Sequence, residues 1–153
     1  MTPSVPALRC LVVGIDGSDD AARALDWAIA LARPTGARVV AVHALGLLDR
    51  IGDARVATGT HREAITREFT DRWCAALDRA DVPADRIAVD GPPAEVVLAV
   101  ARSEAADLVV MGERGVGGTA AELGSTSRRV LASTTVPVLV VPTAPTAGPG
   151  PPP

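Results

Sequence analysis

A glycine-rich segment, residues 112–127, carries the residues of this chain best suited to bind an anion. Glycines let backbone N–H groups approach an anion closely, and a helix beginning at Gly124 and Ser125 would add unpaired N–H groups and its positive dipole end. Ser125, Thr126 and Ser127 would supply hydroxyl donors. The segment therefore predicts a phosphate site without lysine; the alternative is a flexible loop in which Ser125 only caps a helix.

Three other positions could take part in chemistry. Asp16 could accept a hydrogen bond from a ribose hydroxyl or hold Mg²⁺ beside phosphates, or it could be a turn residue bonded to its own backbone. Arg128 and Arg129 could meet a phosphate, although a solvated helix face is the more common fate of such residues. His43 has no partner base or nucleophile nearby in sequence, so we expect a neutral histidine packed at a strand end.

Composition excludes several classes of protein. All 15 basic residues of the 153-residue chain are arginine, and Lys, Asn, Gln and Tyr are absent. The chain therefore lacks the lysine of a P-loop nucleotidase or of Schiff-base chemistry. The net charge of -3 and 2% aromatic content argue against nucleic-acid binding. Cys10 and Cys74 are too few for a disulfide framework or zinc site, and no catalytic residues are apparent.

These residues must be positioned by alternating strands and helices. Short apolar runs typical of buried strands occupy residues 9–15, 37–44, 107–111 and 136–141, with a weaker strand at 86–89. Ser18 can cap a helix that ends at residues 34–36, and residues 61–80 form a helix with an apolar stripe. Pro92 and Pro93 begin another helix, and a last one ends near Ser133. Residues 45–60 are expected to be a loop.

Strands that alternate with helices predict an α/β fold, with a parallel sheet covered by helices on both faces. In such sheets, ligands bind beyond the carboxyl ends of the strands, where the strand order reverses. Asp16, His43 with Ala44, and Gly112 each follow a predicted strand. The polar candidates therefore lie where a ligand site is expected.

The ends of the chain carry few signals. Residues 1–8 show no charged start of a signal peptide, and the apolar runs are too short to span a membrane, so we expect a cytoplasmic protein. Residues 1–142 are predicted to form one domain. Residues 143–153 consist mostly of Pro, Gly, Thr and Ala, and we expect them to form a disordered tail.

Three segments together resemble the universal stress protein family. They are VVGIDGSDDAARALDWA near the start, DGPPAEVVLAVARSEAADLVVMGERG in the middle, and GSTSRRVLASTTVPVLVVP before the tail. The resemblance extends from Leu11 to Val141. It implies a Rossmann-like fold of the adenine-nucleotide alpha hydrolase type, with five parallel strands in the order 3-2-1-4-5. It also implies a homodimer through the last strand, Val138 to Val141.

The nucleotide-binding branch of that family implies a role for each matching residue as part of an ATP site. Gly112, Gly115, Gly124 and Ser125 would hold the triphosphate, with Thr126 as a further donor. Asp16 would contact the ribose, with Mg²⁺ reaching it through the phosphates. Adenine would meet backbone atoms of Ile15 and Ala44, and Met111 would line the pocket wall.

The glycine loop differs from the family pattern. Eight residues separate Gly115 from Gly124, one fewer than the pattern has, and Glu113 is expected to bring a carboxylate near the phosphates. An ATP-binding stress-response or signalling module is therefore the leading hypothesis. A dimeric module that no longer binds nucleotide is the first alternative. A slow Mg²⁺-dependent ATPase using Asp16 and a cyclic AMP binder are the others.

Overall fold

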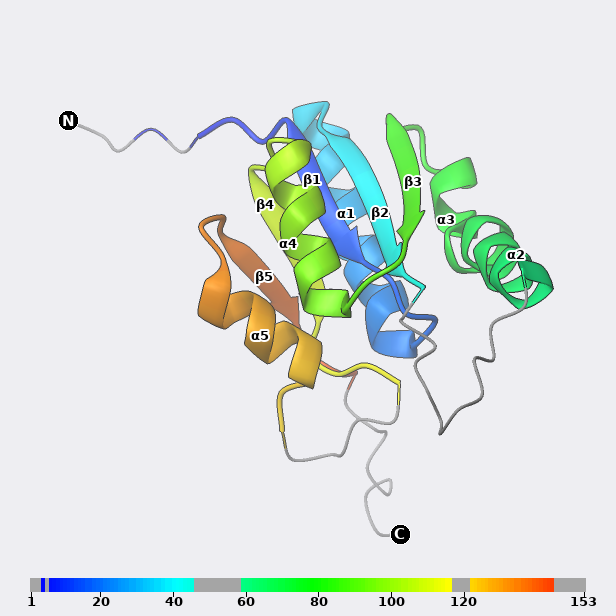
Figure 1. Ribbon diagram of the computed structural model, residues 1–153. Helices are drawn as coiled ribbons and strands as arrows, with labels where there is room; N and C mark the ends of the chain where they lie inside the picture. Colours follow the sequence, from blue (N-terminus) through cyan, green and yellow to red (C-terminus); the bar gives the residue numbers. More distant parts are fainter. Residues whose placement is uncertain (1–3, 5, 46–58, 117–121, 145–153) are drawn as a thin grey trace, which may run out of the picture.

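The computed structural model describes residues 4, 6–45, 59–116 and 122–144. Within them, five parallel strands form one sheet in the order β3-β2-β1-β4-β5, which confirms the predicted α/β class and strand order (Figure 1). The strands are β1 (Cys10–Gly14), β2 (Arg38–Ala44), β3 (Ala84–Val89), β4 (Leu108–Gly112) and β5 (Val138–Val141).

Strands β1 and β4 contain no polar side chain because both of their faces are covered. In β1, Leu11 and Val13 point into one apolar core and Val12 into the other, and all three side chains are fully buried. In β4, Val109 and Val110 alternate in the same way. Side chains of a strand alternate between faces, so a strand without polar positions requires two covering layers.

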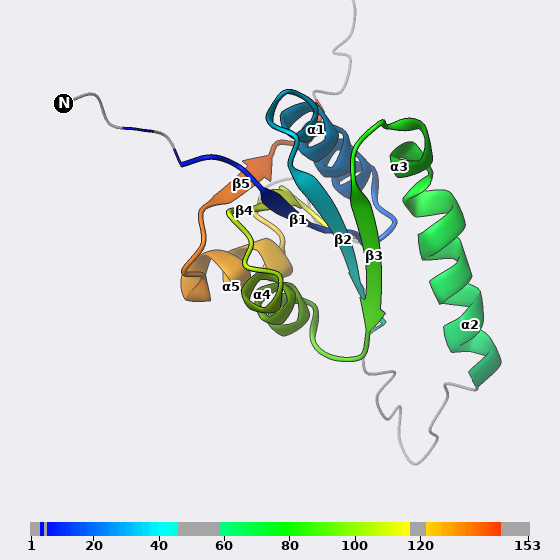
Figure 2. The same cartoon turned by 90° about the horizontal axis from the view of Figure 1, so that it is seen from above.

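The helices supply those layers. One face is covered by α1 (Asp19–Thr35) together with the segment that contains α2 (Gly59–Glu68) and α3 (Ala75–Arg79). The other face is covered by α4 (Pro93–Ser103) and α5 (Ser125–Ser133), as the view along the sheet makes plain (Figure 2). No helix among the residues described is both long and apolar enough to cross a bilayer.

Helix α1 begins and ends where the sequence predicts. The Ser18 side chain caps it by accepting a hydrogen bond from the Ala21 N–H. The helix continues through Pro34 and ends at Gly36, whose φ of 70° is the left-handed conformation common after helices. Proline is tolerated here because it lies in the last turn, where the Thr35 hydroxyl donates to the Leu31 carbonyl at 2.8 Å.

The helix predicted at residues 61–80 is not continuous. A π-helical turn, Phe69–Trp73, separates α2 from α3, and the Cys74 N–H donates to the Phe69 carbonyl five residues back. Residues four apart drift by about 40° per step on an α-helix. The wider π turn removes much of that drift, so Phe69 and Leu77 both stay buried in the same core.

Other boundaries differ from the prediction by one to three residues. Strand β3 begins at Ala84 instead of residue 86, and β5 begins after Pro137. Most of the expected loop, residues 46–58, lies outside the described residues, as does 145–153 of the expected tail. Thr143, the first residue of that tail, is hydrogen-bonded to Glu113 and Asp20.

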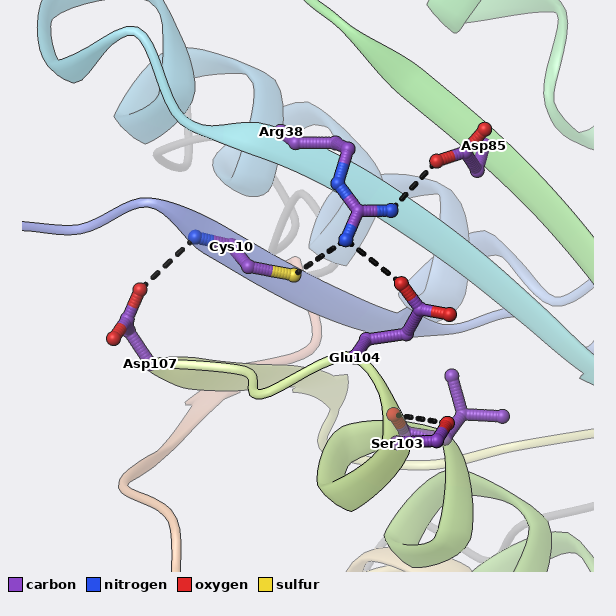
Figure 3. Close-up of polar contacts among 7 residues, drawn as sticks. Cys10, Arg38, Asp85, Ser103, Glu104 and Asp107 are labelled. Atoms are coloured by element: carbon purple, nitrogen blue, oxygen red, sulfur yellow. Dashed lines mark hydrogen bonds and ion pairs between the residues drawn. The ribbon is translucent and has the colours of Figure 1, made fainter.

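A polar cluster joins the amino ends of the strands. Arg38 at the start of β2 pairs with Asp85 of β3 at 2.6 Å and with Glu104, after α4, at 2.7 Å (Figure 3). Asp107 accepts hydrogen bonds from the backbone N–H groups of Arg9 and Cys10. Cys10 is buried, and burial raises the pKa of its thiol, which is consistent with the expected inert core residue.

Candidate functional site

A cleft of about 470 Å³ opens at the other end of the sheet, where β1 lies between β2 and β4. The strand order reverses at this point, as the sequence predicted for the site. The cleft is formed by the carboxyl ends of β1, β2 and β4, the loop after β4, and the first turn of α5. All nine predicted binding residues line it: Ile15, Asp16, Ala44, Met111, Gly112, Gly115, Gly124, Ser125 and Thr126.

The Asp16 carboxylate fixes two loops relative to each other. One oxygen accepts hydrogen bonds from the N–H and the hydroxyl of Ser18, which forms the turn into α1. The other accepts from the Val116 N–H at 3.2 Å, one hundred residues along the chain. Asp16 therefore has the turn role considered above and also holds the glycine loop. A directly bound metal ion would have to compete with these three donors.

Glycine is required at Gly112 and Gly115 because the backbone passes very close to other groups. A Cβ atom on Gly115 would lie 2.6 Å from an Asp16 carboxylate oxygen. A Cβ atom on Gly112 would lie 2.8 Å from the backbone carbon of Asp20. The two glycines thus let the end of β4 and the loop after it pack against Asp16 and the start of α1.

The first turn of α5 faces the cleft with donors. Gly124, not Ser125, is the N-cap, and its own N–H donates to the Glu113 carbonyl at 2.7 Å. Ser127 was expected to offer its hydroxyl to a phosphate. Its hydroxyl is instead buried and donates to the Gly112 carbonyl. Ser125 and Thr126 line the cleft, where the first N–H groups of the helix lack intrahelical acceptors.

Two carboxylates support the loop after β4: Asp20, which sequence reasoning missed, and Glu113, which it placed differently. Asp20, in the first turn of α1, is buried and accepts hydrogen bonds from the Arg114 N–H and the Thr143 hydroxyl. Glu113 accepts from the Thr143 N–H at 2.8 Å and does not line the cleft. The expectation of a Glu113 carboxylate beside the phosphates is therefore wrong. The position of Glu113 in the glycine loop could not reveal its partner, because Thr143 lies thirty residues further along the chain, after β5.

The opposite end of the cleft is mostly apolar. Val42, Ala44 and Val97 line it. His43 donates from Nδ1 to the Ile15 carbonyl at 2.7 Å, and its ring meets Trp73 edge-on with centroids 5.0 Å apart. This geometry agrees with a packed histidine. Both backbone groups of Ile15, which were expected to meet the adenine, therefore already have partners within the protein: its carbonyl accepts from His43, and its N–H donates to the Val42 carbonyl.

Charged side chains at the cleft balance one another. Asp16 and Glu122 are acidic, and Arg114 and Arg128 are basic. Arg128 approaches Glu122 at 3.6 Å, with both side chains more than half exposed. Within the described part of the chain, no group of three or more His, Cys, Asp or Glu side chains could hold a metal ion.

Three comparisons with known proteins accompany this geometry. A universal stress protein from Thermus aquaticus is 38% identical over 136 residues, covering 87% of this chain and 98% of the relative. A solved universal stress protein in complex with cAMP is 30% identical, with a TM-score of 0.66, covering 91% of this chain and all of that one. A third, from Archaeoglobus fulgidus in complex with dAMP, shares the fold at 20% identity, with a TM-score of 0.67 and coverage of 88% and 98%.

The family model for universal stress proteins matches residues 8–142, which include every strand of the sheet and all nine residues predicted for the cleft. The match and the high identity to the Thermus relative over nearly its full length support the same assignment. The chain therefore belongs to the universal stress protein family.

Proposed function

We propose that this protein binds an adenine nucleotide, ATP first among them, in the cleft at the carboxyl ends of β1, β2 and β4. The observation that carries the proposal is the convergence of the α5 N-terminus and a tightly packed glycine loop on one side of an apolar pocket. Its volume, about 470 Å³, lies within the ordinary range for small-molecule sites. The relatives that are complexes with cAMP and dAMP support an adenine ligand.

Each part of the cleft suits one part of a nucleotide. The apolar end near Val42 and Val97 would accept the base, with the Ala44 backbone as a polar partner. The N–H groups of the first turn of α5, with Ser125 and Thr126, would receive phosphate oxygens. Asp16, which holds the glycine loop, would contact the ribose, and Mg²⁺ would enter with the phosphates. We infer that ligand occupancy serves a stress-response or signalling role.

Two features bear on the nucleotide-free alternative. The loop between Gly115 and Gly124 is one residue short, and its residues 117–121 lie outside the described part. The Glu113 carboxylate, however, accepts a hydrogen bond from the Thr143 N–H and does not line the cleft. This weakens one of the two arguments against phosphate binding.

The test begins with the purified protein. It is denatured, and any released nucleotide is identified by chromatography; the stripped protein is then titrated calorimetrically with ATP and with cyclic AMP. We expect a bound or titratable adenine nucleotide. Absence of binding to both ligands in the presence of Mg²⁺ would contradict the proposal and favour the dimeric interaction module.

Two matched variants give the test its specificity. Asp16→Asn puts an amide donor or a weaker acceptor opposite the Val116 N–H, so the glycine loop loses an anchor and we expect ATP affinity to fall about tenfold or more. Asp19→Asn removes the same charge from an exposed neighbour and should leave affinity unchanged. Equal affinities for the two variants would remove Asp16 from the site.

We also propose that two copies associate through β5. It is one of the two edge strands of the sheet, and Val138, Leu139 and Val140 are only partly covered within one chain. An apolar edge strand has unpaired backbone groups that a second copy can satisfy.

A further inference from the structure

The phosphate side of the cleft carries an ion pair that no role described so far requires. Arg128, one turn into α5, and Glu122, just before it, both line the cleft. The guanidinium lies 3.6 Å from the Glu122 carboxylate and 3.4 Å from the Leu123 carbonyl. Their side chains are 62% and 72% exposed, so the pair is weak and can be exchanged for other partners at low cost.

The position of Arg128 relative to the ligand follows from the fold. Its backbone N–H closes the first turn of α5 by donating to the Gly124 carbonyl. The side chain reaches back towards the start of α5, because its guanidinium contacts the Leu123 carbonyl and the Glu122 carboxylate, both just before that helix. A base bound at the apolar end would be far from it, whereas phosphates at the α5 N-terminus would be near.

Two arginines line the cleft, Arg114 in the loop after β4 and Arg128 in α5, and Arg128 is the one that pairs with Glu122. Because the chain contains no lysine, a cationic side chain that meets a phosphate must be arginine. The guanidinium forms stronger and more directional bonds with phosphate oxygens than with a carboxylate held at 3.6 Å. The Glu122 carboxylate, in contrast, repels every additional phosphate that enters.

We propose that the Glu122–Arg128 pair sets the preference of the cleft for the number of phosphates on the nucleotide. Arg128 leaves Glu122 to bind phosphate oxygens of di- and triphosphates, and Glu122 opposes their charge. The pair adds nothing to the binding of the nucleoside itself. This inference rests on the proposed nucleotide site and adds to it a residue pair that selects among adenine nucleotides.

The experiment measures affinities of one protein for adenosine, AMP and ATP by calorimetry at constant ionic strength. Arg128→Gln should weaken ATP about tenfold and leave adenosine unchanged, as expected for the loss of a charge-assisted hydrogen bond. Glu122→Gln should tighten ATP several-fold, and AMP less. Arg129→Gln, which removes the same charge from an exposed neighbour outside the cleft, is the matched control and should change none of the three affinities.

The possible results distinguish failure of the Glu122–Arg128 inference from failure of the proposed nucleotide site. Equal weakening of adenosine and ATP by Arg128→Gln would show a structural role and overturn the inference. Equal effects of Arg128→Gln and Arg129→Gln on ATP would show general surface electrostatics and also overturn it. If the unmodified protein binds adenosine and ATP equally, the pair inference fails while the nucleotide site stands. If it binds none of the three, the proposed function fails and the pair inference with it.

Discussion

At the scale of single residues, Thr143 links the segment after β5 to the cleft. Its hydroxyl donates to the buried Asp20 carboxylate at 2.7 Å, and its N–H donates to Glu113. Thr143→Val removes the hydroxyl donor and keeps the shape, so Asp20 loses a partner. We expect the free energy of unfolding to fall by about 1–2 kcal/mol, the lower part of the range for hydrogen bonds to charged groups, because this one is only partly buried.

Thermal unfolding checks this expectation, with a decrease in Tm of about 3–6 °C for a chain of this size. Thr143→Ser retains the hydroxyl and is the control. A Thr143→Val protein that unfolds at the same temperature as the Thr143→Ser protein would show that Asp20 does not depend on this bond.

Residue types alone were enough to locate the cleft but did not reveal which donors are already used. All nine predicted residues line it because the carboxyl ends of parallel strands meet at one edge. Ser127 was expected to donate to a phosphate, and Glu113 to repel one. In the structure, the Ser127 hydroxyl donates to the Gly112 carbonyl, and the Glu113 carboxylate accepts from the Thr143 N–H. Such partners come from packing between distant segments, which spacing along the chain does not encode.

At the scale of elements, the π turn at Phe69–Trp73 offers a deletion test. A π turn holds one residue more than an α-helical turn. Deleting the exposed Asp71 should convert it to an α-helical turn and leave Phe69 and Leu77 on the same core face, so we expect a cooperatively folded protein. Deleting the exposed Ala30 from the regular helix α1 should rotate the following residues by about 100° and destabilise the fold severely.

Circular dichroism and thermal melts distinguish the two deletions. If the Asp71 deletion is as destabilised as the Ala30 deletion, the π turn is needed for its own geometry and not merely tolerated.

The β5 edge allows a test of association. The carbonyls of Pro137 and Val141 bond β4, and backbone groups alternate in direction along a strand, so the Val140 N–H points to the open edge. Val140→Pro removes that donor and should shift the protein from dimer to monomer. Val140→Thr keeps the N–H and a β-branched side chain and should leave the dimer intact.

Light scattering at micromolar protein is the measurement. If the unmodified protein is a monomer with and without ATP, association through β5 is excluded at that concentration.

Element types and order were predictable, whereas several boundaries were not. Continuous apolar runs identified β1, β2 and β4 because those strands are buried on both faces. The end of α1 was also predictable, because Pro34 lies in the last turn and Gly36 is the C-cap. The start of β3 was placed two residues too late, and the start of β5 two residues too early. The stripe at positions 65, 69, 73 and 77 repeats every four residues, and this spacing is the one sequence signal that could have indicated a π turn.

At the scale of the whole molecule, alkaline pH reports on the buried thiols. Burial raises the pKa of Cys74 to about 11 from an ordinary value of 9.0, and it also raises the pKa of Cys10. Between pH 9 and 11 the unfolded chain loses thiol protons that the folded chain retains. Stability conferred by the buried thiols is therefore complete below pH 9 and declines towards pH 11, by at most about 1.4 kcal/mol per pH unit for each group.

Urea unfolding at a series of pH values measures this slope. Cys74→Ala removes one of the titrating groups, so we expect a flatter profile whatever its effect on absolute stability. An identical slope in the variant would assign the pH dependence to other groups.

The Arg38 cluster and the cleft lie at opposite ends of the same strands. A five-residue strand separates them by about 15 Å of apolar sheet, a distance beyond which effects of substitutions usually add independently. Evolution or a protein engineer can therefore alter residues around the cleft without weakening the ties at the amino ends. Stability lost through substitutions at the cleft can likewise be restored at the Arg38 end without changing ligand preference. The fold can therefore tolerate the substitutions that a new ligand specificity requires.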